Sequence, residues 1–285
     1  MLRQLPLKVN PIPMLHFFRK IRYDLIANSK SFKYFKYAIG EIILVVIGIL
    51  IALQINNWNE NQKKEIKTLN DLHNLKEALI DDIASIELNL TFNKTRLRGI
   101  FYILKHSEMN TQTFTTIPWI DISKNEIDNY TWKGPFPNTL NREFTELAFS
   151  MLGRGFGGIA INKTVINELN STGSFSNIQN ANLKKKIGNY YSFLNQRFEG
   201  YAIEEHEEWA NEVTRFLRDD YGIFTLDVSY LKDPLAPLKN KKDVEHQLRY
   251  LALEVNYHCY WSSQAKQKAL DIVRLVDEEV KRLKN

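Results

Sequence analysis

Residues 38–55 decide the architecture of this chain; they read Ala-Ile-Gly-Glu-Ile-Ile-Leu-Val-Val-Ile-Gly-Ile-Leu-Ile-Ala-Leu-Gln-Ile. Their uninterrupted apolar core, residues 42–53, is twelve residues long, a length that also suits a buried core helix or a signal peptide. Aromatic residues flank this core at Tyr37 and Trp58, where the two interfaces of a bilayer would lie. At about 1.5 Å per residue these two residues are roughly 30 Å apart, the thickness of a hydrocarbon core. We therefore predict a transmembrane helix over residues 37–58.

The residues on either side of the span favour an uncleaved signal anchor. A cleaved signal peptide has a short basic region before its apolar part and small residues at its cleavage site. Here the preceding arm is long, and residues 54–58 read Gln-Ile-Asn-Asn-Trp, a poor cleavage sequence. A helix of a soluble bundle would show polar residues every three or four positions, which residues 42–53 lack. A cleaved signal peptide and a soluble core helix remain the alternatives.

The distribution of charge predicts an orientation and argues against a nucleic-acid partner. The net charge of +5 and the pI near 9.0 would suit a protein that binds phosphate backbones. Residues 1–37, however, hold eight basic side chains and one acid, whereas the remaining residues hold 30 basic and 32 acidic side chains. Positive residues stay on the cytoplasmic side of a span. We predict a basic cytoplasmic arm over residues 1–36, with a short interfacial helix at 15–22, and an exported domain over residues 59–285.

Five polar or small residues of the predicted span indicate how its helix could contact the membrane interfaces or a second helix. Glu41 lies about one turn inside the cytoplasmic interface, and Gln54 is its counterpart at the other end. Gly48 and Ala52 form a pair of small residues four apart, and Gly40 lies on the same face two turns earlier. Such a stripe lets helices approach closely, so a homo-oligomer through the span is one interpretation. The other is that small residues are simply frequent in membrane helices.

Two stretches of the sequence resemble a known family. The first comprises residues 17–22 and 37–60, in which Gly-Glu directly precedes the apolar run; the second comprises residues 168–178 with Leu183, Tyr190 and Tyr191. They resemble an uncharacterised family of single-pass membrane proteins, known mainly from Bacteroidota and defined only as a domain of unknown function. The resemblance implies a bacterial inner-membrane protein with a periplasmic domain. It implies no activity, substrate, cofactor or catalytic residue, and it leaves open whether translation starts at Met1 or at Met14.

The sequence after the span predicts a mostly α fold, in which the transmembrane helix continues into a long amphipathic helix. Apolar residues recur at steps of three, four or seven between Leu72 and Leu104, which indicates one helix over about 59–106. Residues 109–140 contain three prolines and are expected to be irregular, with a short hairpin around Gly134. Three long and two short helices are expected to form the exported bundle. After the first long helix, the others are expected at about 141–152, 162–170, 180–217 and 243–283.

Two motifs that resemble functional signatures are interpreted as structural. Residues 153–158 satisfy G-x-G-x-x-G, but a dinucleotide site needs a strand before the motif and an acid about twenty residues later. Here a helix is predicted before the motif and the acid is missing. His206 begins a sequence like the zinc-protease pattern H-E-x-x-H, but Ala210 replaces the second imidazole that zinc requires.

The remaining chemically active side chains form no recognisable constellation. Glu254 and His258 lie one helical turn apart, but no second half of a metal site accompanies them. Cys259 is the single cysteine, so neither an intrachain disulfide nor a cysteine-based metal site can form. The acids at positions 204, 205, 207 and 208 are interpreted as a solvated helix face. No catalytic residue, cofactor-binding residue or metal ligand is therefore predicted.

The function predicted from these features is that of an interaction, scaffold or sensory module held at the bilayer by one span, with a protein partner that the sequence does not identify. A long helix that rises from the membrane into a bundle suits a relay between packed helices. The alternative is an exported enzyme or metal-binding protein with a site between helices. That site would use the acids at 204–208 with His206, or Glu254 with His258.

Overall fold

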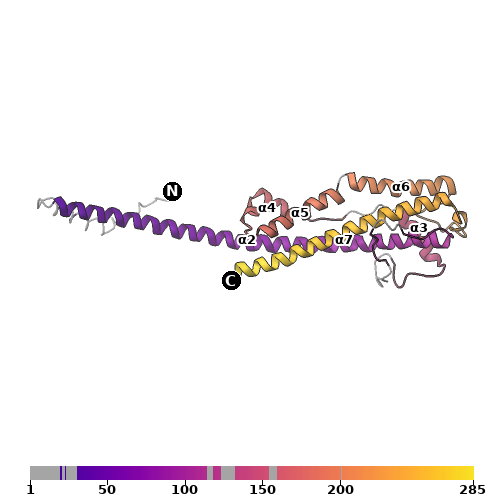
Figure 1. Ribbon diagram of the computed structural model, residues 1–285, viewed down its shortest axis with the longest axis horizontal. Coiled ribbons are helices and arrows are strands. Elements are labelled where there is room, and N and C mark those ends of the chain that lie inside the picture. The colour runs from indigo at the N-terminus through magenta and orange to yellow at the C-terminus, as the bar shows by residue number, and fades with distance from the viewer. Residues whose placement is uncertain are drawn as a thin grey trace, which may run out of the picture. The chain divides into compact units, whose positions relative to one another are not determined.

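The computed structural model describes residues 20, 23, 31–113, 118–122, 132–153, 159–199 and 201–285, without the side chains of 31–34, 37 and 201–206. Within these ranges the chain is helical or irregular and forms no β-strand, which confirms the mostly α fold. It divides into two compact units, residues 1–65 and 66–285. The predicted interfacial helix at 15–22 lies outside the described residues except for Lys20. The helices are α2 (Ser31–His106), α3 (Arg142–Leu152), α4 (Thr164–Ser171), α5 (Ala181–Phe198), α6 (Tyr201–Tyr221) and α7 (Lys242–Lys284) (Figure 1).

The part of α2 that belongs to the first unit exposes its apolar side chains. Ile42 is 63 % exposed, Leu50 55 % and Trp58 66 %. Each of these side chains has a large apolar surface whose removal from water would be favourable. By length and composition, α2 is the one helix in the described part of the chain that could cross a membrane. The helix does not end at Trp58 but extends to His106, which confirms that the apolar helix continues into an amphipathic one.

The second unit is a bundle whose first and last passes run antiparallel (Figure 1). Lys76 of α2 pairs with Asp277 of α7 at 2.7 Å, and Glu87 of α2 pairs with Lys266 at 2.6 Å. The partners on α7 therefore fall in number as the residues on α2 rise. This order shows that the two longest helices lie side by side and run in opposite directions.

The second pass also runs back along α2. Arg96 of α2 donates a hydrogen bond to the carbonyl of Met151 at the end of α3, and Ser85 accepts one from the amide of Ala160. Residue numbers again fall on one side as they rise on the other. The short helices α3 and α4 thus form one pass of the bundle, antiparallel to α2.

The third pass consists of α5 and α6, which follow one another along α7. Lys186 of α5 pairs with Asp271, and Tyr221 at the end of α6 donates a hydrogen bond to Asp243 near the start of α7. The second unit therefore has four antiparallel passes, of which the second and third are interrupted. This arrangement is that of an up-down-up-down helical bundle.

One helix expected from the sequence is wrong. A single helix over about 180–217 was predicted, but the structure has two, and Glu199 between them is extended with φ −134° and ψ 157°. Gly200 follows in the sequence, and glycine is about 1 kcal/mol less favourable than alanine inside a helix. The other expected helices are confirmed: Asn141 caps α3 by accepting a hydrogen bond from Phe144 N–H, and Asn180 caps α5 through Leu183 N–H.

The irregular segment after α2 is confirmed where it is described. Asn256 of α7, fully buried, accepts a hydrogen bond from Ile120 N–H at 2.9 Å and donates one to Pro118 O at 3.0 Å. One amide side chain thus satisfies two main-chain groups that no helix or sheet serves. Gly134 has a φ of 90°, as a turn requires, but the hairpin expected around it lies partly outside the described residues.

The core of the second unit confirms the apolar stripe predicted for α2. Leu72, Leu75, Leu79, Ile86 and Leu97 are fully buried against apolar residues of α3, α5, α6 and α7. Fully burying one such side chain contributes about 1.5–3 kcal/mol. This core, rather than the intrinsic helix propensity of the separate segments, holds the four passes together.

Candidate functional site

The span residues singled out from the sequence all lie on α2 in the first unit. A Cβ added to Gly40 or Gly48 would meet no atom within 4 Å, so both glycines present open backbone. Ala52 and Gln54 are exposed, and Glu41 is partly exposed. The face formed by the small residues is therefore accessible to another helix, and self-association stays a prediction.

The glycine-rich motif begins at a packed position. Gly153 is the residue that follows α3, and residues 154–158 lie outside the described part of the chain. A Cβ at Gly153 would lie 2.9 Å from Thr214 Cγ2 and 3.0 Å from Thr225 Oγ1, closer than van der Waals contact permits. A side chain at this position would require the side chains of Thr214 on α6 and Thr225 on the following loop to move. A helix precedes the motif where a dinucleotide site needs a strand, so the structural interpretation is supported.

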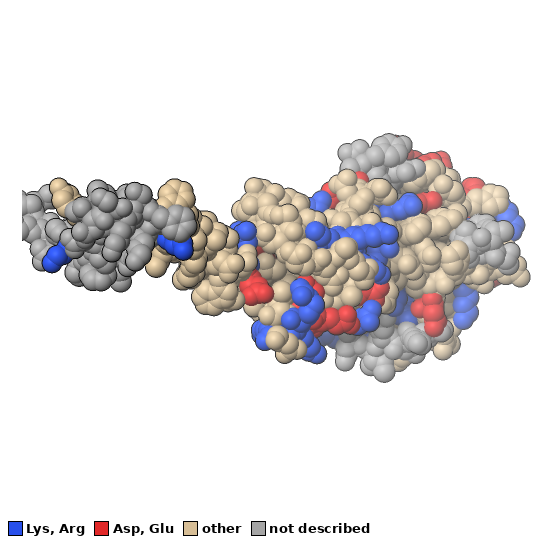
Figure 2. Space-filling view, turned by 60° about the vertical axis from the view of Figure 1, so that its left-hand side comes forward, with Lys and Arg blue, Asp and Glu red and all other residues tan. Residues whose placement is uncertain are grey.

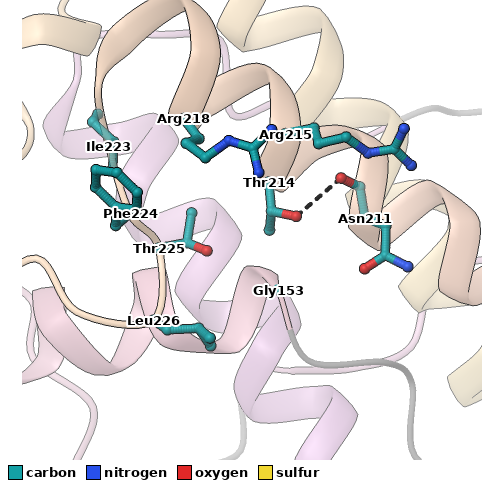
Figure 3. A pocket seen from close by; sticks show the side chains of 9 residues that line it. All are labelled: Gly153, Asn211, Thr214, Arg215, Arg218, Ile223, Phe224, Thr225 and Leu226. Atoms are coloured by element: carbon teal, nitrogen blue, oxygen red, sulfur yellow. Dashed lines mark hydrogen bonds between the residues drawn. The ribbon is translucent and has the colours of Figure 1, made fainter.

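A pocket of about 280 Å³ opens beside Gly153 (Figure 3). The end of α3, one face of α6 and the loop after α6 surround it, as the close-up shows. Its lining residues are Gly153, Asn211, Thr214, Arg215, Arg218, Ile223, Phe224, Thr225 and Leu226. No acidic side chain is among these nine residues, whereas two are arginines.

The loop wall of the pocket is held by hydrogen bonds to its own main chain. Gly222, with a φ of 66°, ends α6 and starts the loop. The hydroxyl of Tyr230 donates to Gly222 O at 2.7 Å and accepts from Phe224 N–H at 3.0 Å. Arg142 of α3 donates to the carbonyl of Val228 at 3.0 Å and also to those of residues 229, 231 and 232. The wall is thus positioned from both ends.

The two arginines of the pocket differ in their partners. Arg218 donates to Asp219 Oδ1 and Oδ2 at 2.7 and 3.0 Å, and these hydrogen bonds hold the pKa of Asp219 below its ordinary value. Arg215 forms no hydrogen bond or ion pair within the residues that the structure describes, and its side chain is exposed. The rim therefore carries one guanidinium that is partly engaged and one whose donors are available.

The threonine of the loop wall is the buried polar group of this pocket. Thr225 is 5 % exposed, and Figure 3 shows its side chain facing the space between α6 and Gly153. Its hydroxyl forms no hydrogen bond with the described residues. The hydroxyl oxygen is not among the fully buried polar atoms that lack a partner, so it keeps access to the pocket and can bond there to water or to a ligand.

Of the residues of this pocket, the sequence had singled out only Gly153, as the start of the glycine-rich motif. Arg215 and Arg218 are three residues apart, which places both on one face of a helix, and this spacing was the available signal. Thr225 lies in a loop, and nothing in the sequence places it beside Gly153. The pocket exists only because the second and third passes meet.

A second polar cluster is buried between α2, α5 and the start of α4. Tyr190 donates a hydrogen bond to Asp82 Oδ2 at 2.9 Å, and Asn162 N–H donates to Asp82 Oδ1 at 2.7 Å. Burial nevertheless raises the pKa of Asp82 above its ordinary value of 3.8, and burial also raises the pKa of the Tyr190 hydroxyl. The carboxylate, the tyrosine hydroxyl and the main-chain amide bond to one another inside the bundle, so we interpret the cluster as structural.

We expect Asp82 to make the stability of the bundle depend on pH. Because the pKa of Asp82 is raised in the folded state, its stabilising contribution is present below 3.8 and is lost as the pH rises through the folded value. Asp82→Asn should remove this loss, so the variant gains stability relative to the parent protein as the pH rises through this window. Urea unfolding across that window, followed by circular dichroism, measures the difference.

Asp82→Ala is the matched control for that experiment. It removes both acceptor oxygens, so Tyr190 and Asn162 N–H lose their partner and stability should fall by about 1–3 kcal/mol at every pH. If the free-energy difference between Asp82→Asn and the parent protein were the same at all pH values, the proposed titration of Asp82 would be wrong.

The histidine considered for a metal site lies in the core. His258 Nε2 is 2.8 Å from Asn89 Oδ1, and Asn93 donates to the same amide oxygen at 3.1 Å. The side chains of residues 201–206, which include His206, are outside the described part. Among the described residues, no group of three or more histidine, cysteine or acidic side chains could hold a metal ion. Cys259 is buried.

Fold and composition define a mostly helical chain in which one long helix of the described part is apolar enough to span a membrane. Residues 41–154 match the family model DUF6090, a family of unknown function. The match confirms the resemblance to an uncharacterised family, and it covers less than half of the chain. Comparisons with curated proteins and with solved structures gave no match.

Proposed function

We propose that this protein is a single-pass inner-membrane protein whose helical bundle serves as an interaction, scaffold or sensory module in the periplasm. The observation that carries the proposal is the contrast within α2. From Ile42 to Ile55 its aliphatic side chains are exposed, whereas from Leu72 to Leu104 they form the core of a bundle. Exposed aliphatic residues over about 20 Å of helix are favourable in lipid and costly in water.

The charge of the two units supports the proposed orientation. The arm before the span holds eight basic residues and one acid, whereas basic and acidic residues nearly balance after it. Figure 2 shows lysines and arginines interspersed with acids over the visible face of the second unit. A surface that mixes both signs of charge is typical of a domain that is surrounded by water, and it lacks the excess of positive charge with which proteins bind polyanions. The basic arm, in contrast, has the charge that binds the anionic inner leaflet of a membrane.

A binding role is supported by how the polar groups of the bundle are used. The buried carboxylate, histidine and amides described above are engaged with one another and with main-chain groups, as structural groups are. The pocket beside Gly153, in contrast, presents unused donors at the surface. A bundle that binds a ligand or a protein partner, and whose packed helices shift on binding, is the mode of action that this division favours.

Self-association through the span is part of this proposal. The open faces of Gly40 and Gly48, with Ala52 four residues later, support close approach of a second copy. Single cysteines placed at Gly48 in membranes would crosslink in a dimer. Monomers throughout would remove the dimeric form and leave the anchored module as proposed.

Reporter fusions are expected to place the bundle outside the cytoplasm. Alkaline phosphatase, active only after export, should be active when fused after Asn285, and green fluorescent protein at the same position should be dark. The physical reason is the excess of basic residues before the span. The matched control is a fusion after Lys36, before the span, for which the opposite pattern is expected. A fluorescent, phosphatase-inactive fusion after Asn285 would overturn the orientation.

A further inference from the structure

We propose that the pocket beside Gly153 binds a small organic oxyanion, in which a carboxylate or phosphate group lies against Arg215 and Arg218 and a compact apolar part lies against the loop wall. The site lies wholly within the second unit. Its test is therefore independent of the membrane topology proposed above.

The size of the pocket limits the ligand. About 280 Å³ lies just below the range of pockets that hold drug-sized molecules, roughly 300–1,000 Å³. A single aromatic or short aliphatic acid fits such a space, whereas a nucleotide or a folded partner does not. The proposed ligand is accordingly a molecule with one charged head and one ring or short chain.

The sign of the charge follows from the lining. Two arginines and no acidic residue are among the residues that line the pocket. Arg218 donates hydrogen bonds to Asp219 from its Nε and one terminal nitrogen, so its other terminal nitrogen is available to a ligand. Arg215 forms no hydrogen bond with the described residues, so all of its donors are available to a ligand. Planar guanidinium groups pair with carboxylate and phosphate oxygens through parallel hydrogen bonds. An oxyanion is the group that satisfies this rim.

The hydroxyl of Thr225 is the independent observation that a ligand belongs here. Thr225 as a residue is 5 % exposed, its hydroxyl faces the pocket, and that hydroxyl forms no hydrogen bond with the described residues. A polar atom of a ligand would satisfy it without any rearrangement of the loop, since Tyr230 and Arg142 already hold that loop in place. This hydroxyl therefore offers a polar contact deeper in the pocket, whereas the charged side chains lie at its rim.

The apolar part of the ligand is inferred from the loop wall. Phe224 is 58 % exposed and Leu226 is 69 % exposed, although both line the pocket. Covering part of these side chains would contribute favourable free energy that an inorganic anion cannot obtain. An organic anion should for this reason bind more tightly than inorganic phosphate.

The test is calorimetric titration of the full chain in detergent with benzoate, phenyl phosphate, inorganic phosphate and the neutral benzyl alcohol. Benzoate or phenyl phosphate should bind saturably with a dissociation constant of about 1 mM or below, and higher salt should weaken binding. Inorganic phosphate and benzyl alcohol should each bind at least about tenfold more weakly, because each lacks one of the two contacts. The two organic anions together distinguish a carboxylate from a phosphate head.

Variants identify the site. Arg215→Gln and Arg218→Gln should each weaken binding about tenfold, and Thr225→Val should weaken it a few-fold. Asp219→Asn releases Arg218 and should strengthen binding. Arg274→Gln, at an exposed position on α7, is the matched control and should leave binding unchanged. The thermal midpoints of the arginine variants report whether they remain folded.

Three results would overturn the proposal as a whole, and a fourth would overturn its apolar part. The first is no saturable binding of either organic anion up to about 10 mM. The second is equal binding of benzoate and benzyl alcohol, which would show an apolar site without charge recognition. The third is binding that the two arginine variants leave unchanged although both are folded, which would place the anion elsewhere. Inorganic phosphate binding as tightly as phenyl phosphate would overturn the apolar part of the ligand.

Discussion

Replacing Ile47 and Leu50 together by arginine should release the protein from membranes. Both side chains lie near the middle of the apolar run and are about half exposed in the structure. Arginine at the centre of a membrane helix costs about 2.5–3.5 kcal/mol on insertion scales, so the pair costs roughly 5–7 kcal/mol. A change of that size exceeds a thousandfold in the partition between membrane and water. Alkaline carbonate extraction and immunoblotting of pellet and supernatant measure it.

Ile47→Leu with Leu50→Ile is the matched control, because it keeps the apolar surface and the helix length. This variant should remain in the pellet like the parent protein. Retention of the double arginine variant in carbonate-washed membranes would contradict the transmembrane assignment of residues 37–58.

Arg96→Ala should destabilise the bundle by about 3–5 kcal/mol. Arg96 is fully buried, which is rare for a charged side chain. Its Nε donates to Met151 O at 2.8 Å, its Nη1 donates to Asn93 Oδ1 at 3.2 Å, and its guanidinium lies 5.2 Å from the ring centre of Phe92. Truncation leaves a cavity and removes a hydrogen-bond donor from the end of α3. Urea unfolding of the full chain in detergent, followed by tryptophan fluorescence, measures the loss.

Arg96→Met separates the two causes. Methionine fills most of the volume but donates no hydrogen bond, so the expected loss is about 1–3 kcal/mol. Arg274→Ala is the control for removing an arginine from the surface and should change stability by less than about 0.5 kcal/mol. A loss below about 1 kcal/mol for Arg96→Ala would show that the first and second passes are not joined through this side chain.

Local patterns predicted most of the helices. Asn141 precedes α3 and Asn180 precedes α5, and in the structure each caps its helix. The failure at Glu199 has a physical reason. The apolar stripe of α5 and α6 has the same period on both sides of the break, and periodicity does not register one extended residue in the main chain.

The candidate site was not predictable in the same way. Arg215 and Arg218 share a helix face, but helix faces with two basic residues are common and usually solvated. The two arginines become part of a candidate site only because Thr225 on the loop and Gly153 at the end of α3 line the same pocket. These residues are up to 72 positions apart in the sequence. No spacing rule connects them, because their proximity follows from the packing of two passes.

The sequence by itself determined the apolar helix, its basic flank and the helical class of the domain after it. Each of these depends on the composition of a contiguous segment, and solvent or lipid acts on such a segment directly. Only the tertiary structure decided that α2 shares its core with the other three passes of the bundle, that Arg96 is buried, and that Thr225 and Gly153 line the same pocket as the two arginines. Those features depend on which distant segments pack together, and packing is decided by the whole set of buried side chains at once.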